Sequence, residues 1–343
     1  MDRKSIVFAQ PQRVEFMSTP MPAMDDDSVL VKTTVTSVSR GTELNLYNGR
    51  TRSIRGRWYA WYPLVPGYEA VGRVLEVGRN VTHLKPGDRA VGANVVDGFE
   101  GLCCAWGGQT AYGAYTQATG PGSAGNTAVR IPDGVSDEEA LMVVLAAVPL
   151  HGIRVKLPFL ASGMSVLVTG LGAMGLATCQ FLKHLGVRVI AGDPIEHRTQ
   201  VAGAAGWADV ICARDEALQK AVAQTTDGGP DVVIDTTGSH ECLCLGLEMV
   251  KDRGTVLGMG LYLQPMMLDL CNTLWSRSLT FACCAGESPQ LRAEILDMIA
   301  DGRFDARSLI SARFDVEQAA EVYRRVNDEP HKIIKPIIRW AED

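Results

Sequence analysis

Two kinds of hydrophobic pattern divide the chain near residue 150. Before that point, short runs of alternating hydrophobic and polar residues are separated by Gly, Pro and Asp, as in 28–39, 69–78 and 88–96. Alternation with a period of two is typical of strands with one buried face. We therefore predict a β-rich domain over residues 1–150, completed by residues 288–343.

Residues 151–287 alternate between strand-like and helix-like runs. The strand-like runs SVLVTG, VRVIAGD, ADVIC, PDVVIDTTG and GTVLGMG are hydrophobic on both faces. Such strands are typical of a parallel sheet covered by helices. The predicted fold class is therefore α/β, in which a doubly wound parallel sheet accompanies the β-rich domain. A further helix is expected over 138–156, with Ser136 as its N-cap. Two amphipathic helices are expected in 288–304 and 312–328, the second with Asp315 as its N-cap, and a closing strand is expected over 331–340.

Composition narrows the class of protein. The 343 residues are 46% hydrophobic and 21% charged, as in soluble proteins of about two domains. The net charge of −6 gives no general attraction to nucleic acid or anionic membranes. Apolar runs fall well short of the ~20 residues of a membrane span, and the N-terminus lacks the pattern of a secretion signal. Nine Cys without a disulfide framework favour reduced thiols, so we expect a cytoplasmic protein.

The most specific motif is SVLVTGLGAMG, residues 165–175. An apolar strand leads into Gly170-x-Gly172-x-x-Gly175, and a helix follows at once. Gly170 permits a tight turn, Gly172 lets the backbone approach a pyrophosphate, and Gly175 lets the helix pack against the strand. The helix N-terminus at Ala173 and Met174 presents N–H groups to the anion. The motif predicts a dinucleotide cofactor; the alternative is an α/β domain that keeps the turn without the ligand.

Asp193 indicates which dinucleotide is bound. It lies 18 residues past Gly175, at the end of the next predicted strand. This is close to the spacing of an acid that accepts hydrogen bonds from the ribose hydroxyls, and its charge repels a 2′-phosphate. NAD is therefore favoured over NADP, although Arg198, just after the acid, is able to accommodate that phosphate.

Thr236, Thr237, Gly238 and Gly260 follow the fourth and fifth predicted strands. Ligands of open α/β sheets bind at these strand ends, so we expect the four residues to line the nicotinamide side. Ordinary strand exits carry the same residue types, which leaves a purely structural role open for each.

The order of motifs resembles the medium-chain dehydrogenase/reductase superfamily over essentially the whole chain. GYEAVGRV and PGDRAVG come first, and VLVTGLGAMG and DVVIDTTG follow. The resemblance implies a GroES-like catalytic domain, a Rossmann NAD-binding domain and a substrate cleft between them. SVSRGTE and GYEAVGR resemble the zinc-independent branch that includes bacteriochlorophyllide hydroxyethyl dehydrogenase. That branch implies NAD-dependent oxidation of secondary alcohols.

The zinc-binding positions of the family are changed. Arg40, Tyr68 and Val144 stand where zinc-dependent members carry their catalytic ligands. Four closely spaced Cys bind a structural zinc in such members, whereas this chain has only the adjacent Cys103 and Cys104 in that region. The resemblance therefore implies that neither metal is bound.

Polar residues at the altered catalytic position suggest how the chemistry proceeds without zinc. The developing alkoxide must meet hydrogen-bond donors or a proton acceptor. Tyr68 is the first candidate, and Arg40 would make it a base by lowering its pKa; alternatively Tyr68 only fills the space of the metal. Thr42 matches a proton-relaying hydroxyl of the family, or it caps a helix.

Two further residues have counterparts in the family. Glu69 matches a glutamate that pairs with a buried arginine. His151 either passes a proton from the ribose to solvent or is a packing residue.

The segment 47–63 combines four Arg with four aromatic residues, among them Arg57, Trp58 and Trp61. In this family it would border the substrate cleft, where such residues suit a planar, carboxylated or phosphorylated substrate. A solvated loop or a subunit contact is the alternative.

The leading interpretation is zinc-independent, NAD-dependent oxidation of a secondary alcohol to a ketone, the alcohol being a polyol, sugar-like or a larger natural product. An NAD(P)H-dependent quinone or enoyl reductase is the alternative enzyme, and Asp193 argues against it. A non-catalytic dinucleotide-binding protein is the third possibility. The resemblance also implies a homodimer or homotetramer, with 278–286 at the joined sheet edge.

Overall fold

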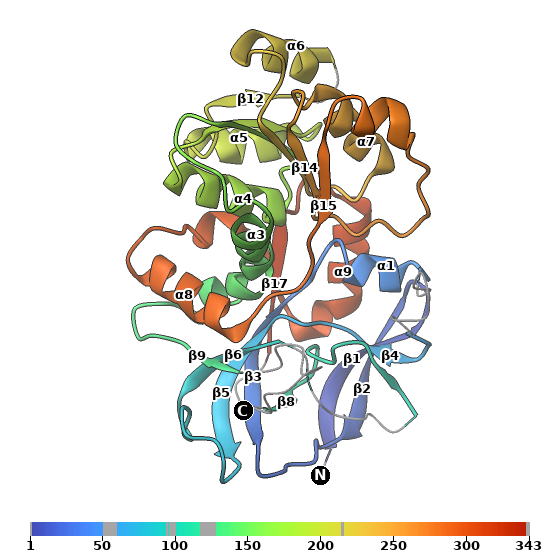
Figure 1. The fold of residues 1–343 in the computed structure, drawn as a ribbon. Coiled ribbons are helices and arrows are strands. Elements are labelled where there is room, and N and C mark those ends of the chain that lie inside the picture. The colour runs from blue at the N-terminus through green and yellow to red at the C-terminus, as the bar shows by residue number, and fades with distance from the viewer. Residues whose placement is uncertain are drawn as a thin grey trace. The chain divides into compact units, whose positions relative to one another are not determined.

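The computed structural model describes residues 2–50, 60–93, 95, 101–116, 128–213 and 216–340. The chain forms two compact units, one of Met1–Ala147 with Glu287–Asp343 and the other of Val148–Gly286 (Figure 1). The predicted α/β class is confirmed, because one unit is rich in strands and the other alternates strands with helices. The domain boundaries at 150/151 and 287/288 stay a prediction.

The second unit contains a six-stranded parallel sheet in the order β12-β11-β10-β13-β14-β15. Its strands are β10 (Ser165–Thr169), β11 (Arg188–Gly192), β12 (Val210–Cys212), β13 (Val232–Asp235), β14 (Thr255–Gly258) and β15 (Thr280–Cys283). Its helices after the first strand are α4 (Ala173–His184), α5 (Glu196–Ala204), α6 (Glu216–Thr225) and α7 (His240–Met249). The strand order reverses beside β10, so its carboxyl end opens at a switch point where such sheets bind ligands.

The outer end of this sheet carries features that the sequence pattern did not predict. The π-helix η2 (Leu270–Trp275) precedes the edge strand β15. Met267 and Trp275 are 98% and 77% exposed. The expected joining of two chains along this edge stays a prediction.

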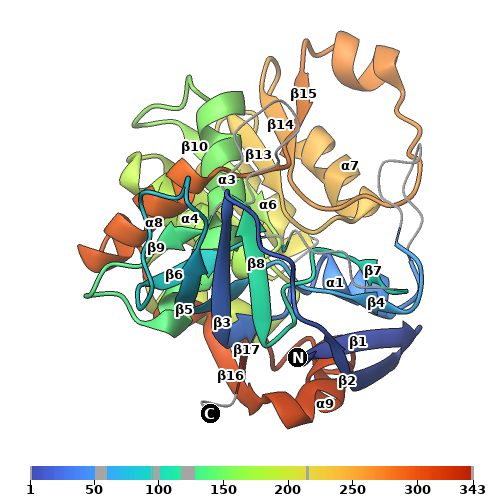
Figure 2. The same ribbon diagram turned by 90° about the horizontal axis from the view of Figure 1, so that it is seen from below.

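The first unit holds two sheets. The larger has the order β16-β17-β3-β5-β6-β9, and β8 pairs with β3. Its strands are β3 (Ser28–Ser37), β5 (Ala70–Val77), β6 (Arg89–Gly92), β8 (Tyr112–Thr116), β9 (Val129–Arg130), β16 (Ile310–Asp315) and β17 (Lys335–Arg339). The smaller sheet, β2-β1-β4-β7, is built from β1 (Asp2–Gln10), β2 (Arg13–Pro20), β4 (Leu64–Val65) and β7 (Cys103–Cys104). Figure 2 shows β3, β5 and β8 side by side.

The helices agree with most of the sequence predictions. Ser136 caps α2 (Asp137–Ala140) in a capping box with Glu139, as expected, and α3 (Met142–Lys156) follows. The remaining helices are α1 (Glu43–Tyr47), α8 (Pro289–Ala300), η3 (Arg307–Leu309), η4 (Val316–Gln318) and α9 (Ala319–Asp328). Asp315 stands at the N-cap of η4, as expected, and α9 follows, while residues 312–315 also belong to the strand β16, which was not predicted. Phe314 is buried there while its two neighbours are exposed, which is the alternation of a strand.

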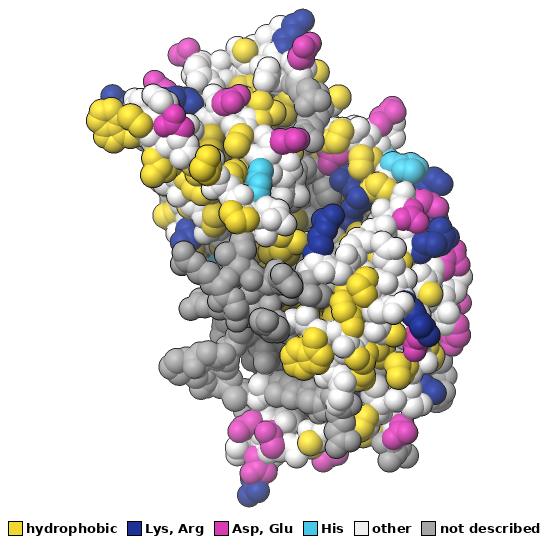
Figure 3. Space-filling model, turned by 90° about the vertical axis from the view of Figure 1, so that its right-hand side faces the viewer, with side chains coloured by type: hydrophobic (Ala, Val, Ile, Leu, Met, Phe, Trp, Pro, Cys, Tyr) yellow, Lys and Arg dark blue, Asp and Glu magenta, His cyan; other side chains and the backbone are white. Residues whose placement is uncertain are grey.

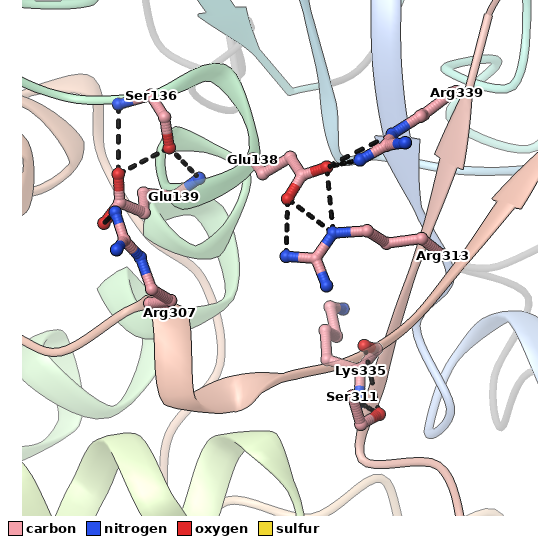
Figure 4. Close-up of polar contacts among 8 residues, drawn as sticks. All are labelled: Ser136, Glu138, Glu139, Arg307, Ser311, Arg313, Lys335 and Arg339. Carbon is pink, nitrogen blue, oxygen red and sulfur yellow. Dashed lines mark hydrogen bonds and ion pairs between the residues drawn. The ribbon is translucent and has the colours of Figure 1, made fainter.

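Each acidic residue of α2 pairs with an arginine from a different element. The Glu138 carboxylate pairs with the guanidinium of Arg313, in β16, at 2.7 Å and with that of Arg339, in β17, at 2.8 Å (Figure 4). Asp137 pairs with Arg89 at 2.9 Å, and Glu139 with Arg307 at 3.3 Å. These ion pairs tie the short helix to β6, to η3 and to the C-terminal strands β16 and β17 of the same unit.

Glu138→Gln is expected to lower the free energy of unfolding by about 1 kcal/mol at pH 7, because the pairs are partly exposed and screened. Burial raises the pKa of Glu138, but Arg313 and Arg339 outweigh it and leave the pKa below its ordinary 4.5. The stabilisation is therefore present above that value and is lost as the pH falls below it. Urea unfolding at pH 7 and about pH 3 measures this difference, with the exposed Glu317→Gln as the control. Equal losses at both pH values would contradict the assignment.

The surface has no continuous basic area on the face drawn in Figure 3, where described Lys and Arg side chains are interspersed with Asp and Glu. Within the described residues, no helix is both long and hydrophobic enough to cross a membrane.

Candidate functional site

The glycine turn between β10 and α4 has the geometry that a pyrophosphate site needs. Gly170 adopts φ +88°, which only glycine reaches without strain. A Cβ on Gly175 would lie 1.8 Å from the Gly170 carbonyl oxygen, so the helix packs on the turn only with glycine there. A Cβ on Gly172 would meet no atom within 4 Å. The turn therefore leaves open space over Gly172, directly before the first residues of α4, Ala173 and Met174.

Asp193 lies directly after β11 and holds this turn in place. Its carboxylate accepts hydrogen bonds from the Leu171 amide at 2.7 Å and the Ile195 amide at 2.8 Å. The Arg198 guanidinium pairs with the same carboxylate at 3.2 Å, and Asp193 is only 2% exposed. The acid and the arginine that bear on cofactor choice are thus in direct contact.

The residues after β13 and β14 also contact the turn. The Thr236 hydroxyl donates to the Gly170 carbonyl at 2.9 Å. A Cβ on Gly260 would lie 2.1 Å from the Gly238 amide nitrogen, so the two loops touch through their backbones. These contacts show a structural role for the three residues, and their expected contact with the nicotinamide stays a prediction.

A buried carboxylate that the sequence analysis did not select lies beneath these loops. Asp235 ends β13 and accepts hydrogen bonds from Thr169 at 2.7 Å, from Thr237 at 2.8 Å and from Tyr262. Thr237, which was predicted to contact the cofactor, therefore donates its hydroxyl hydrogen bond to Asp235. This arrangement joins β10, β13 and the segment after β14 at the carboxyl end of the sheet.

The other candidate residues form a hydroxyl cluster in the β-rich unit. Tyr68 donates from its hydroxyl to the Ser39 hydroxyl at 2.5 Å, and Thr42 also hydrogen-bonds to Tyr68. Thr42 occupies the N-cap of α1 but makes no side-chain capping bond, so the helix-capping alternative is wrong. The Tyr68 ring meets Trp106 edge-on at 5.7 Å. Tyr68 is half-buried.

The electrostatics of Tyr68 differ from the expectation. Burial, followed by the charge of Glu69, raises its pKa, so the phenol stays protonated. Arg40 donates to the Pro330 carbonyl at 3.1 Å. The hypothesis that Arg40 lowers the pKa of Tyr68 and makes it a base is therefore wrong. Tyr68 is suited to exchange hydrogen bonds as a neutral hydroxyl.

Glu69 forms an ion pair beneath this cluster. Its carboxylate lies 2.5 Å from the Lys335 ammonium, and both residues are 1% exposed. Lys335 also donates to the Val38 carbonyl at 3.3 Å. The expected arginine partner was wrong, because the first residue of β17 supplies a lysine instead.

Glu43, which the sequence analysis did not select, is the second carboxylate of the cluster. One oxygen accepts from the Ser39 amide at 2.8 Å, and the other accepts from Tyr323 at 2.6 Å and Gln109 at 3.5 Å. The side chain is fully buried. Burial raises the pKa of Glu43 to about 7.

The remaining predicted residues lie outside these two clusters. His151 is half-buried on α3, and Trp61 is 55% exposed. Arg57 and Trp58 lie outside the described residues. The expected substrate contacts of the segment 47–63 stay predictions.

Comparison with known proteins places both units in one family. The family model "Alcohol dehydrogenase GroES-like domain" matches residues 25–133, and "Zinc-binding dehydrogenase" matches residues 173–301. An alcohol dehydrogenase of Cupriavidus necator is 24% identical over 98% of both chains. The D-xylulose reductase of Saccharomyces cerevisiae is 23% identical over 99% of this chain and 98% of its own. The structure of an Escherichia coli alcohol dehydrogenase complexed with NADH has a TM-score of 0.82 at 20% identity. The match covers 98% of this chain and 99% of the E. coli chain.

The chain belongs to the alcohol dehydrogenase-like superfamily. The predicted GroES-like and Rossmann architecture is thereby confirmed. The zinc-independent branch stays a prediction.

The residues that the sequence resemblance aligns with the metal ligands of this superfamily do not fit zinc. Arg40 and Val144 offer no ligand atom that zinc accepts, and the Tyr68 hydroxyl is kept protonated. Among the described residues, no group of three or more His, Cys, Asp or Glu is arranged to hold a metal ion. The dinucleotide fits, since the turn leaves open space at Gly172 and a helix N-terminus behind it.

The sequence contained partial signals for the missed residues. Ser39 and Glu43 are the first and last residues of the motif SRGTE, in which only Arg40 and Thr42 were predicted to be site residues. Lys335 is a charge inside the otherwise hydrophobic run IIKPII, where a buried partner is required. Tyr323 carried no comparable signal, because a tyrosine on a helix is an ordinary core residue.

Proposed function

We propose that this protein oxidises a secondary alcohol to a ketone with NAD and without a catalytic zinc. The hydroxyl cluster around Tyr68, Ser39 and Thr42 carries the proposal, because the resemblance aligns Tyr68 with a metal ligand of zinc-dependent members and the Tyr68 hydroxyl is hydrogen-bonded to Ser39. The glycine turn with Asp193 supports a dinucleotide that carries a free ribose 2′-hydroxyl. The alcohol dehydrogenase and D-xylulose reductase relatives support an alcohol or polyol substrate.

Bound dinucleotide supplies the acceptor for the hydride that leaves the carbinol carbon. The chain orients the substrate oxygen and manages its proton. The Tyr68 hydroxyl, held by Ser39 and Thr42, accepts a hydrogen bond from the substrate hydroxyl and passes its own proton toward Ser39. Lys335 compensates the charge of Glu69, so the cluster does not accumulate two uncompensated carboxylates.

A screen of secondary alcohols and polyols with NAD, followed by NADH absorbance, tests this function. NAD is expected to bind at least about tenfold more tightly than NADP, because Asp193 repels a 2′-phosphate. The purified protein is expected to contain well under one zinc per chain. Stoichiometric zinc that is required for turnover would contradict the metal-free mechanism.

One observation favours a second function. Arg198 already contacts the Asp193 carboxylate and is able to meet a 2′-phosphate by a small displacement. Tighter binding of NADP in the same titration would therefore favour the quinone or enoyl reductase. Dinucleotide binding without turnover of any alcohol, quinone or enone would favour a non-catalytic protein.

Tyr68→Phe is expected to lower kcat of alcohol oxidation by about 100-fold, because the proton of the substrate loses its first acceptor. The affinity for NAD should stay unchanged, since Tyr68 belongs to the other unit. Steady-state rates and a fluorescence titration measure the two effects. An unchanged kcat would show that Tyr68 only fills space, and Tyr112→Phe, on β8, provides a control outside the cluster.

A further inference from the structure

Two carboxylates are buried behind the Tyr68 hydroxyl, and their partners differ. Glu69 forms a close ion pair with the Lys335 ammonium. The donors to Glu43 are neutral: the Ser39 amide, the Tyr323 hydroxyl and the Gln109 amide. Through their charges, Glu69 raises the pKa of Glu43 and Lys335 lowers it.

The charges of this group favour one exchangeable proton. With both carboxylates ionised, Lys335 leaves a net charge of −1 in a buried space. With one proton added, the group is neutral. Since Glu69 is held by the ammonium, Glu43 is the carboxylate that gains the proton at least cost. The raised pKa of Glu43, about 7, agrees with this assignment.

Ser39 connects Glu43 to the hydroxyl cluster. Its hydroxyl accepts from Tyr68 at 2.5 Å. Its amide donates to the Glu43 carboxylate at 2.8 Å, and its carbonyl accepts from the Glu43 amide at 2.9 Å. Two hydrogen bonds thus fix the Ser39 backbone against Glu43, while the Ser39 hydroxyl is bonded to Tyr68.

We propose that Glu43 is the proton acceptor of alcohol oxidation and is reached from the substrate through the hydroxyls of Tyr68 and Ser39. This inference rests on the proposed function. As the carbinol C–H pair leaves as hydride to the dinucleotide, the substrate O–H proton moves to Tyr68. The Tyr68 proton moves to the Ser39 hydroxyl. That hydroxyl then turns from Tyr68 toward the Glu43 carboxylate, which the Ser39 amide already holds, and gives it its proton. Three O–H bonds break and three form, and the products are the ketone, the reduced dinucleotide and a neutral Glu43. The same hydroxyls return the proton to solvent after the ketone leaves.

The pH profile of kcat/KM for alcohol oxidation in the full-length protein tests this role. The wild-type rate should rise with pH through about 7, because Glu43 accepts a proton only when ionised. Glu43→Gln keeps the shape of the side chain and should lower the rate at least about 100-fold and abolish that inflection. NAD affinity, measured by fluorescence titration, should be unchanged. A Glu43→Gln variant that binds NAD and keeps the wild-type rate and inflection would overturn the proposal.

Tyr323→Phe provides the second variant, in case Glu43→Gln does not fold. The Tyr323 hydrogen bond lowers the pKa of Glu43, so its removal should move the inflection to higher pH. A purely structural role of Tyr323 would change rate or stability without moving the inflection, and an unmoved inflection would overturn the proposal. A wild-type protein that binds NAD but oxidises no alcohol would instead refute the proposed function itself.

Discussion

Gly175→Ala is expected to abolish dinucleotide binding and to destabilise the parallel-sheet unit. The added Cβ would lie 1.8 Å from the Gly170 carbonyl oxygen, far inside van der Waals contact. The obstacle is backbone, so α4 and the turn must move apart. We expect a loss of about 3 kcal/mol or more in the free energy of unfolding and at least about a 100-fold loss in NAD affinity. Urea unfolding and a fluorescence titration measure both.

Gly172→Ala is the matched control in the same turn. Its Cβ would meet nothing within 4 Å, and the backbone angles of Gly172 are open to alanine. Gly172 is the N-cap of α4, where alanine is less favourable than glycine, so the free energy of unfolding should fall by about 1 kcal/mol, well below the loss expected for Gly175→Ala. If a pyrophosphate approaches the backbone here, the methyl group should still weaken NAD binding at least about tenfold. Undiminished affinity in a folded Gly172→Ala protein would show that the pyrophosphate lies elsewhere.

The parallel sheet was predictable because its signals are local. The runs from SVLVTG to GTVLGMG are hydrophobic on both faces, and a run of this kind has few other stable environments. The strand β16, which was not predicted, shows the limit of this reasoning. Residues 312–315 pair with β17, and that pairing depends on a strand more than twenty residues away.

The candidate site was predictable only where a motif is contiguous. Gly170, Gly172 and Asp193 follow from spacing along one strand–turn–helix unit. The partners of Glu69 and Glu43 come from β17, α9 and the loop after β7, and no spacing rule joins these segments. The sign of the pKa shift of Tyr68 was missed for the same reason, since it depends on burial and on the neighbouring carboxylates.

Lys335→Met is expected to cost about 3–5 kcal/mol of unfolding free energy, because it leaves Glu69 buried beside Glu43 without its cation. Methionine fills a volume similar to that of lysine, so the loss of stability measures the missing charge and not a cavity. Lys332→Met, on an exposed lysine of the same segment, should cost less than about 0.5 kcal/mol. Urea unfolding at pH 8, where Glu43 is ionised, measures both variants.

The double variant Lys335→Met/Glu69→Gln separates electrostatics from packing. Removing the orphaned carboxylate should restore most of the stability lost with the lysine, since replacing both partners of a buried pair costs far less than removing one. A double variant no more stable than Lys335→Met would show that the lysine acts through its hydrogen bond to the Val38 carbonyl and its packing. Restored folding with a slower alcohol oxidation would show instead that the Glu69–Lys335 pair also serves the reaction.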